Sequence, residues 1–361
     1  MARVLVASDK FKGTLSSRQV ADAVSEGIRR VRPEVIVDSV LVADGGDGTL
    51  AAAVAAGFEL VLRTATGPTG EPVETGFARR GEVAVVELAD VSGLSRLPGG
   101  VLAPLTATSR GTGELIAAAI DAGCTQVILG IGGSACTDGG AGLVRALGAR
   151  LLDAAGADLP EGGAALTSAA SLDLTALRER LAGVQIVVAC DVDNPLTGPS
   201  GAAATYGPQK GASPTQVKQL DDALIHWADL IAHETLQQPP SPRLEPKREH
   251  PGDAVPAGGQ RPSSRAAASA DLRDVAGAGA AGGVGLAAVA LLGGVVRPGI
   301  ELLLELVGFG VRLRGVELVV TGEGALDEQT LRGKAVGGGA AAAREVGVPV
   351  VVVCGRNGLE P

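Results

Sequence analysis

The sequence predicts an α/β protein built around parallel sheets, and two observations lead to this class. Residues 3–7 and 35–41 are apolar, β-branched runs of the kind that form buried strands. Between them, residues 16–31 carry apolar side chains at helical spacing, and Ser16 with Gln19 has the form of a capping box. A helix that links two buried strands is the repeating unit of a parallel sheet with helices on its faces.

The order of elements changes further along the chain and indicates a second domain. Residues 58–90 hold successive strand patterns with no helix between them. Residues 213–236 predict a long helix with Ser213 as N-cap, Pro214 at the first helical position and Trp227 in the core. Further strand and helix patterns occur at residues 47–57, 112–122, 126–131, 140–148, 185–190, 316–320, 335–346 and 348–354.

Length and composition narrow the class of protein. A chain of 361 residues with a hydrophobic fraction of 46% has enough apolar residues for two domains. A net charge of −9 and an aromatic fraction of 2% make nucleic acid and anionic membranes poor partners. The N-terminal apolar stretch is too short for a signal peptide, and residues 283–296 are too short and glycine-rich to span a bilayer. We therefore expect a cytoplasmic protein with free thiols at Cys124, Cys136, Cys190 and Cys354.

Polar loops of similar composition follow five of the predicted strands. Each combines carboxylates with glycines and with a hydroxyl group, an amide or a lysine. These loops are residues 8–14, 44–49, 132–142, 191–201 and 321–334. Because ligands of open α/β sheets bind beyond the carboxyl ends of the strands, we expect the loops to line one ligand cleft. The alternative is that they are polar turns that only close the strand ends.

The composition of these loops suits phosphoryl transfer better than hydrolysis or redox chemistry. Glycine-rich turns present backbone N–H groups to phosphate oxygens, carboxylates bind Mg²⁺, and lysines neutralise the transferred group. A P-loop is excluded, because Ala335 follows the Gly-Lys pair and the glycine spacing is wrong. Residues 277–282 match the dinucleotide pattern GxGxxG, but a poor strand precedes them. We favour a tight turn before a buried helix, with an NAD-dependent hydroxy-acid dehydrogenase as the alternative.

Seven sequence blocks point together to one family. They are SDKFKGTLSS, VADGGDGT, TSRGTGELI, GIGGSACTDGGAG, DVDNPLTGPSGAAATYGPQKGA, GAGAAGGVG and TGEGALDEQTLRGK. In this order, over residues 2–355, the blocks resemble the bacterial glycerate kinases of the two-domain, non-P-loop type. The resemblance implies ATP-dependent phosphorylation of D-glycerate, with 2-phosphoglycerate favoured over 3-phosphoglycerate as product. It also implies a flavodoxin-like, doubly wound parallel-sheet domain from residues 1–68 and 296–361, with a second α/β domain, residues 69–295, inserted.

The chain departs from the family pattern in two places. Residues 237–269 hold seven prolines in 33 positions, which predicts a disordered or loosely held surface loop that is longer than the family's connection. The chain also ends soon after the strand that closes at Cys354, where family members continue. A catalytically impaired, truncated kinase is therefore a further alternative.

Charge and position within the loops single out the residues that we expect to act with ATP, Mg²⁺ and glycerate. Arg110 and Lys12 are candidates for the substrate carboxylate, because an arginine fork can bind both oxygens. Asp191 is the first candidate for the base at the acceptor hydroxyl and Asp44 the second, with Lys12 also in the catalytic set; both aspartates could instead form Asx turns. The other candidates are Ser134 and Asp138 for the substrate, Gly132, Gly133, Thr137, Gly322, Gly324 and Lys334 for the nucleotide, and Glu323, Asp327 and Asp193 for the metal ion. Besides these small-molecule partners, the prediction allows a homo-oligomer.

Overall fold

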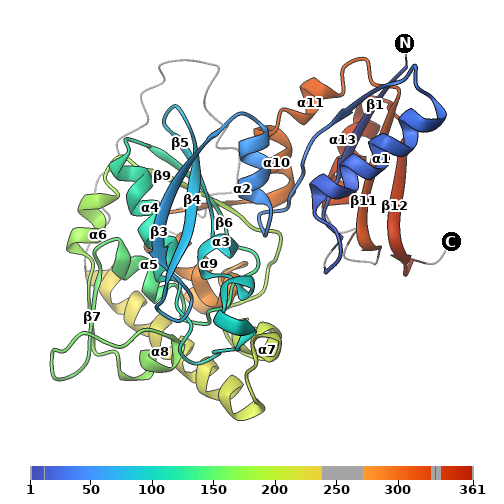
Figure 1. The fold of residues 1–361 in the computed structure, drawn as a ribbon. Helices are drawn as coiled ribbons and strands as arrows, with labels where there is room; N and C mark the ends of the chain where they lie inside the picture. The colour runs from blue at the N-terminus through green and yellow to red at the C-terminus, as the bar shows by residue number, and fades with distance from the viewer. Residues whose placement is uncertain (1, 12, 238–270, 327–329, 331–334, 360–361) are drawn as a thin grey trace. The chain divides into compact units, whose positions relative to one another are not determined.

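The structure is a computed structural model, and it describes residues 2–11, 13–237, 271–326, 330 and 335–359. The chain forms two compact units (Figure 1). Unit 1 consists of Met1–Phe58 and Pro298–Pro361, and unit 2 consists of Glu59–Arg297. Both ends of the chain therefore belong to unit 1, and unit 2 is inserted between them.

The sheet of unit 1 has four parallel strands in the order β12-β11-β1-β2. The strands are β1 (Arg3–Ser8), β2 (Ile36–Ser39), β11 (Leu318–Leu326) and β12 (Val350–Asn357). In chain order this arrangement is 2-1-3-4, which matches the first four strands of the flavodoxin-like order. The crossovers from β1 to β2 and from β11 to β12 run in opposite directions. Because such crossovers are right-handed, the helices that they contain cover opposite faces of the sheet, as the predicted doubly wound fold requires.

Helices α1 and α13 occupy these two crossovers. α1 (Ser17–Val31) begins at the predicted capping box, in which Gln19 N donates to Ser16 Oγ at 3.3 Å and Ser16 N donates to Gln19 Oε1 at 2.9 Å. The core of this unit joins Ala21 of α1 to apolar residues of β1 and β11. The remaining helices of unit 1 are α2 (Thr49–Ala55), α10 (Gly299–Leu306), α11 (Phe309–Arg312) and α13 (Ala335–Glu345).

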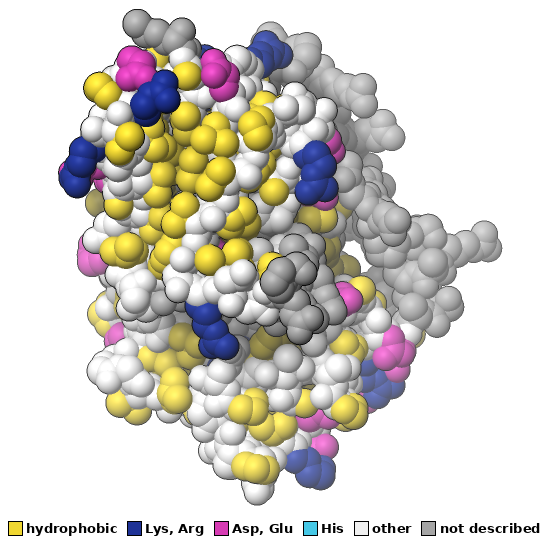
Figure 2. All heavy atoms as spheres, turned by 90° about the vertical axis from the view of Figure 1, so that its right-hand side faces the viewer, with side chains coloured by type: hydrophobic (Ala, Val, Ile, Leu, Met, Phe, Trp, Pro, Cys, Tyr) yellow, Lys and Arg dark blue, Asp and Glu magenta, His cyan; other side chains and the backbone are white. Residues whose placement is uncertain are grey.

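β12 exposes a run of valines. Val351, Val352 and Val353 have exposed fractions of 48%, 39% and 37%, and β12 pairs with β11 alone among the described strands. Figure 2, which views the molecule from the side on which β12 lies in Figure 1, shows apolar side chains gathered over this face. An exposed apolar edge strand of this kind promotes pairing with other strands.

Unit 2 has a six-stranded mixed sheet in the order β10-β9-β6-β5-β4-β3. Strands β5, β6, β9 and β10 are parallel, and β4 pairs antiparallel with both β3 and β5. The strands are β3 (Glu59–Thr66), β4 (Pro72–Arg80), β5 (Val83–Glu87), β6 (Gln126–Gly130), β9 (Gln185–Ala189) and β10 (Val295–Arg297). A separate pair, β7 (Arg150–Leu152) and β8 (Ser171–Asp173), is antiparallel. The chain is thus an α/β protein, as the sequence predicts.

Strand pairing sets the division between the units. β3 pairs with β4 over its whole length, so residues 59–66 belong to the sheet of unit 2. β10 pairs with β9 in the same sheet. The structure therefore divides the chain after Phe58 and after Arg297, whereas the sequence-based boundaries followed residues 68 and 295.

Helices and a packed core cover the sheet of unit 2. They are α3 (Ala89–Ser92), α4 (Arg110–Asp121), α5 (Ala141–Ala146), α6 (Thr175–Arg180), α7 (Ala202–Tyr206), α8 (Pro214–Gln237) and α9 (Ala280–Ala290), with 3-10 turns that include η4 (Pro208–Lys210) and η5 (Leu272–Asp274). α8 begins at Pro214, and Trp227 on this helix is fully buried, so both predictions are confirmed. The four cysteines are free thiols; Cys124 and Cys136 are buried, and Cys190 and Cys354 are partly exposed. In the described part of the chain, no helix is long and apolar enough to cross a membrane.

Candidate active site

The five predicted loops divide between the two units. The loops after β1, β2 and β11 belong to unit 1, and the loops after β6 and β9 belong to unit 2. Parallel pairing places the loops of each unit at the carboxyl edge of its own sheet. Each unit therefore presents its own candidate surface, and we consider the two in turn.

In unit 1 the strand order reverses between β1 and β11, and the carboxyl ends of such a pair form the usual ligand crevice of an open α/β sheet. Asp9 N and Ser8 Oγ each donate to Gly322 O at 2.9 Å, which joins the ends of the two strands. Lys10 Nζ donates to Asp47 Oδ2 at 3.0 Å and to Asp47 O at 2.6 Å, which ties the loop after β2 to the same edge. This edge thus carries a lysine and at least two carboxylates.

Glu323 in β11 is suited to hold a cation. Its Oε1 atom is buried and accepts no hydrogen bond within the described structure, so a bound ion would satisfy it. The other predicted metal ligands stay predictions: Asp193 belongs to unit 2, and Asp327 lies outside the described residues. Among the described side chains there is no group of three His, Cys, Asp or Glu residues that could hold a metal ion.

Gly322 and Gly324 are strand residues, although the sequence predicted a loop after residue 320. β11 continues to Leu326, because it pairs with β12 as far as Asn357. A Cβ atom at Gly322 would lie 2.3 Å from Val353 O, so the neighbouring strand requires glycine there. The predicted contact of Gly322 and Gly324 with the nucleotide stays a prediction.

Asp44 forms an Asx turn, which is the alternative to a catalytic role that the sequence analysis allowed. Its Oδ1 atom accepts a hydrogen bond from Gly46 N at 3.4 Å, which is the pattern of an Asx turn. The side chain is partly exposed, and its carboxylate lies in the loop that Lys10 contacts through Asp47. Asp44 therefore shapes the turn, and a catalytic role for it stays a prediction.

In unit 2 the glycine-rich loop after β6 is closed by neighbouring segments. Trp227 Nε1 donates to Gly139 O at 2.9 Å, and a Cβ atom at Gly139 would lie 2.4 Å from the Trp227 ring. A Cβ atom at Gly140 would lie 2.5 Å from Ala287 of α9, and one at Gly282 would lie 2.2 Å from Cys136 O. These glycines make room for the side chain of Trp227 and for residues 282–287, so protein atoms fill the space beside this part of the loop.

Asp138 is buried inside this closed loop. Its carboxylate accepts hydrogen bonds from Ser109 N and Ser109 Oγ, both at 2.8 Å, and from Gly140 N and Gly142 N at 3.1 and 3.2 Å. Burial raises the pKa of the Asp138 carboxyl, and the bonds from Ser109 and Gly140 oppose that rise. The side chain joins the loop to the start of α4, and the predicted contact of Asp138 with substrate stays a prediction.

Ser134 and Thr137 were also predicted as ligand contacts, and both are buried. Ser134 Oγ accepts a hydrogen bond from Lys210 Nζ at 2.8 Å. Thr137 is fully buried, and its Oγ1 atom has no hydrogen-bond partner within the described structure. Only Gly132 and Gly133 leave the first part of the loop accessible. The predicted ligand contacts of Ser134, Thr137 and Asp138 stay predictions, and all three side chains are buried.

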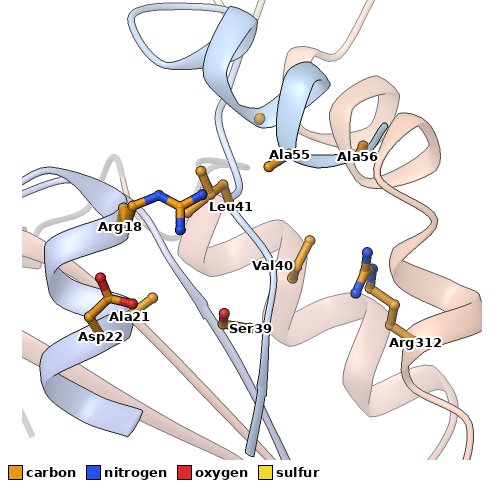
Figure 3. Close-up of a pocket in the computed structure, with 10 residues that line it drawn as sticks. Arg18, Ala21, Asp22, Ser39, Val40, Leu41, Ala55, Ala56 and Arg312 are labelled. Atoms are coloured by element: carbon orange, nitrogen blue, oxygen red, sulfur yellow. The ribbon is translucent and has the colours of Figure 1, made fainter. Parts of the chain in front are cut away.

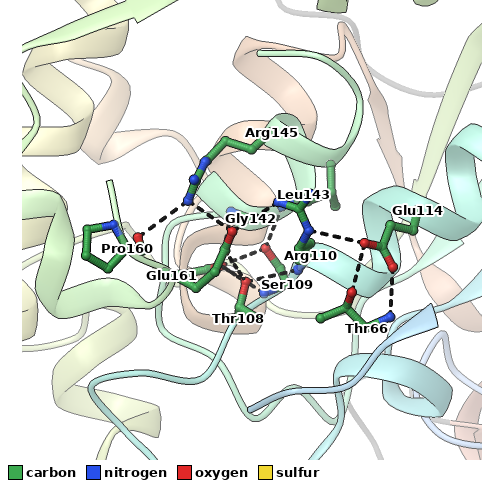
Figure 4. A network of polar contacts seen from close by, with 11 residues as sticks. Thr66, Thr108, Ser109, Arg110, Glu114, Gly142, Leu143, Arg145, Pro160 and Glu161 are labelled. Carbon is green, nitrogen blue, oxygen red and sulfur yellow. Dashed lines mark hydrogen bonds and ion pairs between the residues drawn. The ribbon is translucent and has the colours of Figure 1, made fainter. Parts of the chain in front are cut away.

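Arg110 is held by carboxylates of its own unit (Figure 4). Its Nε atom donates to Glu114 Oε1 and its guanidinium to Glu161 Oε1, both at 3.1 Å. Glu161 also contacts Arg145 at 3.0 Å, and Glu114 accepts hydrogen bonds from the backbone N–H and side-chain hydroxyl of Thr66. Two of the three guanidinium nitrogens of Arg110, Nε and Nη1, thus contact carboxylates of its own unit, and its predicted contact with a substrate carboxylate stays a prediction.

The loop after β9 carries two exposed carboxylates. Asp191 and Asp193 are exposed. The loop behind them is fixed, because Tyr206 Oη donates to Asn194 Oδ1 at 2.6 Å and Asn194 Nδ2 donates to Ser200 O at 2.8 Å. Burial raises the pKa of the neighbouring Cys190 thiol to about 11, which disfavours the thiolate at neutral pH.

Comparison with known proteins identifies the family. The profile of the glycerate kinase family matches residues 4–361. The chain belongs to the glycerate kinase family. It is 41% identical to a glycerate kinase of Bacillus subtilis (strain 168) and 40% identical to a glycerate 2-kinase of Escherichia coli (strain K12), each over 98% of this chain and 85% of the relative. A crystal structure assigned as glycerate kinase 2 from Salmonella typhimurium LT2 superposes with a TM-score of 0.79 at 40% identity, over 98% of this chain and 87% of that one.

Membership of this kinase family agrees with the structure of the GxGxxG segment. The 3-10 turn η5 precedes residues 277–282, where a dinucleotide site requires a strand. A Cβ atom at Gly279 would lie 2.1 Å from Pro195 O, so protein backbone occupies the space that a pyrophosphate needs. The dehydrogenase alternative is therefore not favoured.

The structure also shows charged residues that the sequence analysis missed. Glu87, Gly130, Ala189 and Arg297 are register partners and form one row at the carboxyl edge of the unit 2 sheet. Glu87 and Arg297 are both buried. Glu87 and Arg297 each end an apolar run, and a charged residue at the end of such a run is the sequence feature that could have identified them. Lys210, also missed, is buried beneath the loop after β6.

Several predicted features lie outside the described residues. They are Lys12, Asp327, Lys334 and all but the first residue of the predicted surface loop 237–269. The roles assigned to these residues stay predictions.

Proposed function

We propose that this enzyme transfers the γ-phosphoryl group of ATP to D-glycerate and forms 2-phosphoglycerate. One observation carries the proposal: both units present carboxylate-bearing loops at the carboxyl edges of parallel strands, in a chain of the glycerate kinase family. The choice of the 2-position is supported by the Escherichia coli relative, which is named a glycerate 2-kinase. Phosphoryl transfer needs positioning and charge neutralisation more than covalent chemistry, and such loops supply both.

In this proposal unit 1 binds the nucleotide. The crevice between β1 and β11 is the site at which doubly wound sheets bind phosphate-containing ligands. Lys10 lies at this crevice in contact with Asp47, and Glu323 has the buried carboxylate oxygen that would hold Mg²⁺. Mg²⁺, when bound with the phosphates, neutralises their charge. We keep Lys334 as a phosphate contact.

Unit 2 supplies the base. Asp191 is exposed after β9, on a loop whose next turn is fixed by Asn194 and Tyr206. Its carboxylate would accept the proton of the acceptor hydroxyl as the new O–P bond forms and ADP leaves. Asp44 is the second candidate, although its hydrogen bond with Gly46 assigns it first to the turn.

A substitution series tests the function and the base together. Asp191→Asn is expected to lower kcat by about 100-fold or more without unfolding the protein. Asp158→Asn, on an exposed turn of the same unit, is the matched control and is expected to keep the wild-type rate. The assay measures ADP formation from ATP and Mg²⁺ on addition of D-glycerate, with circular dichroism as the check on folding.

The outcomes separate the parts of the proposal. A wild-type protein that folds but forms no glycerate-dependent ADP contradicts the kinase function for this chain. A near-normal kcat in Asp191→Asn, with a large loss in Asp44→Asn, transfers the role of base to Asp44. A proton-coupled ³¹P NMR spectrum of the product decides between phosphorylation at the 2- and the 3-position.

A further inference from the structure

Lys210 is a buried cation directly beneath the loop after β6. It ends the 3-10 turn η4 and is 2% exposed. Its Nζ atom donates to Ser134 Oγ at 2.8 Å and to the carbonyl oxygen of Cys136. Burial lowers the pKa of the Lys210 ammonium, and the nearby Cys136 and Asp138 oppose that change. The side chain thus places its amino group in the interior at the carboxyl end of a central strand, where Cys136 and Asp138 favour the charged form.

The partners of Lys210 do not neutralise it. Both atoms that accept its hydrogen bonds belong to neutral groups, and no carboxylate lies within ion-pair distance of its ammonium in the described structure. Burying a charge without an ion-pair partner costs several kcal/mol. A positive charge kept at such a cost fits a place where an anion binds.

The accessible part of the loop offers hydrogen-bond donors. The backbone N–H groups of Gly132, Gly133 and Ser134 bond to no acceptor among the described residues. Gly133 has a φ of 77°, in the left-handed region, and a turn that contains such a residue can direct neighbouring N–H groups toward an anion. Leu94 N donates to Gly133 O at 3.1 Å and Ala135 N to Ser92 O at 2.9 Å, so the loop after β5 fixes this turn from behind.

We propose that residues 132–134 bind the carboxylate group of the acid substrate, and that Lys210 is the positioning residue that fixes Ser134 and supplies positive charge beneath them. Because Ser134 Oγ accepts a hydrogen bond from Lys210, the Ser134 hydroxyl hydrogen is available as a donor to the anion. One buried cation matches a monoanion better than a polyphosphate. Arg110 is engaged by Glu114 and Glu161 and does not compete for this role. The inference rests on the proposed function for the identity of the acid.

Lys210→Met tests the charge while keeping most of the side-chain volume. We expect the Kd and the KM for D-glycerate to rise about tenfold or more, since hydrogen bonds of a charged group contribute this much. The KM for ATP is expected to stay within about twofold. Binding of D-glycerate is measured without ATP, by calorimetry and by the fluorescence of Trp227, the single tryptophan, which bonds to Gly139 of the same loop. Lys218→Met removes an exposed lysine of α8 as the matched control and is expected to change neither constant.

Two further variants keep the test valid if Lys210→Met fails to fold. Lys210→Arg retains the charge and is expected to recover part of the affinity for glycerate, which a purely structural role for the lysine chain would not predict. Ser134→Ala removes the hydroxyl alone and is expected to raise the KM for glycerate in the same direction. If Lys210 acts through Ser134, the double variant Ser134→Ala/Lys210→Met binds D-glycerate no less tightly than the single variant with the larger loss of affinity.

The outcomes distinguish the inference from the proposed function. Unchanged glycerate binding in folded Lys210→Met and Ser134→Ala overturns the inference, and so does a rise in the KM for ATP alone, which would make the loop a phosphate site. A wild-type protein that binds D-glycerate in a Lys210-dependent way but forms no ADP contradicts the proposed function and supports the inference. A folded wild-type protein that binds no D-glycerate contradicts both.

Discussion

Two glycine-rich loops of this protein look alike in sequence and differ in structure. Residues 44–49 follow β2 in unit 1, and residues 130–142 follow β6 in unit 2. At Gly48 an added Cβ atom would meet nothing within 4 Å. At Gly139, Gly140 and Gly142 it would meet an atom at 2.2 to 2.5 Å. The first loop is open to solvent or ligand, and most of the second is closed by its own domain.

The difference shows that glycine serves two purposes at the carboxyl edge of a strand. In an open turn it provides a positive φ, since Gly48 has a φ of 100°. In a closed loop it also removes the Cβ atom that would collide with another segment. Gly282 and Gly283 lie against the loop after β6, so two glycine-rich segments pack backbone to backbone there. Four predictions test this contrast, in order of decreasing expected effect.

Gly282→Ala is expected to be the most destabilising change. Gly282 has a φ of 70°, and its Cβ atom would lie 2.2 Å from Cys136 O. Backbone strain and a clash with main-chain atoms together should lower the free energy of unfolding by about 4 kcal/mol or more. Urea unfolding followed by Trp227 fluorescence, which reports unit 2, measures the loss.

Gly156→Ala is the matched control for that prediction. Gly156 lies in unit 2 with a φ of 79°, but its Cβ atom would meet nothing within 4 Å. Strain alone should cost about 1 to 2 kcal/mol. Equal losses in the two variants would mean that the loops are not in contact as the structure has them.

Asp138→Asn is expected to cost about 3 kcal/mol, since it disrupts a buried, charged hydrogen-bond acceptor. The carboxylate accepts from Ser109, Gly140 and Gly142, and an amide would turn donors toward donors. Asp158→Asn, with an exposed carboxylate, should change the free energy of unfolding by less than about 0.5 kcal/mol.

The difference in stability between the wild type and Asp138→Asn should change with pH in a definite direction. Because burial raises the pKa of Asp138 in the folded state, the folded protein holds this proton more tightly than the unfolded chain does. The wild-type advantage over Asp138→Asn should therefore grow as the pH falls from neutrality toward the ordinary carboxyl range. The charged and titratable groups that act on Asp138 are Glu161, Lys210 and Cys136. A wild-type advantage that shrinks as the pH falls would contradict the burial of Asp138.

Much of the fold could be predicted from the sequence, because its signals are local. The capping box of Ser16 and Gln19 lies within one helical turn, and the strand β1 is a continuous buried run. β11 was predicted too short, because the polar residues of TGEG resemble a loop. They remain in the strand because β12, more than 20 residues further along, pairs with them.

The site could be predicted as a set of loops but not residue by residue. Asp138 and Ser134 carry the groups that a ligand site needs, and nothing near them in the sequence shows that distant residues already bond to them. Asp138 bonds to Ser109, 29 residues away, and Ser134 bonds to Lys210, 76 residues away. Arg110 is likewise engaged by Glu161, 51 residues away. Burial by distant segments decides which polar side chains stay available, and one sequence does not contain that information locally.

Gly48→Ala should behave as an open position. With a φ of 100° and no atom within 4 Å of the added Cβ, only strain is expected, and the free energy of unfolding should fall by about 1 kcal/mol. Thermal unfolding of unit 1 followed by circular dichroism measures it, with Gly57→Ala, at a φ of 92° and equally open, as the control. A loss as large as that of Gly282→Ala would show that residues 44–49 are closed as well.

Thr137→Val is expected to have the smallest effect, and it separates the two accounts of the second loop most directly. The Thr137 Oγ1 atom is buried without a hydrogen-bond partner among the described residues, so a methyl group of nearly the same shape removes an unsatisfied polar atom. Stability should stay the same or rise by up to about 1 kcal/mol, and the KM values for ATP and D-glycerate should not change. If the hydroxyl instead contacts a nucleotide phosphate, the KM for ATP will rise about tenfold while stability stays constant. A closed loop predicts the first result and an open loop the second, so kinetics and unfolding of this one variant decide between them.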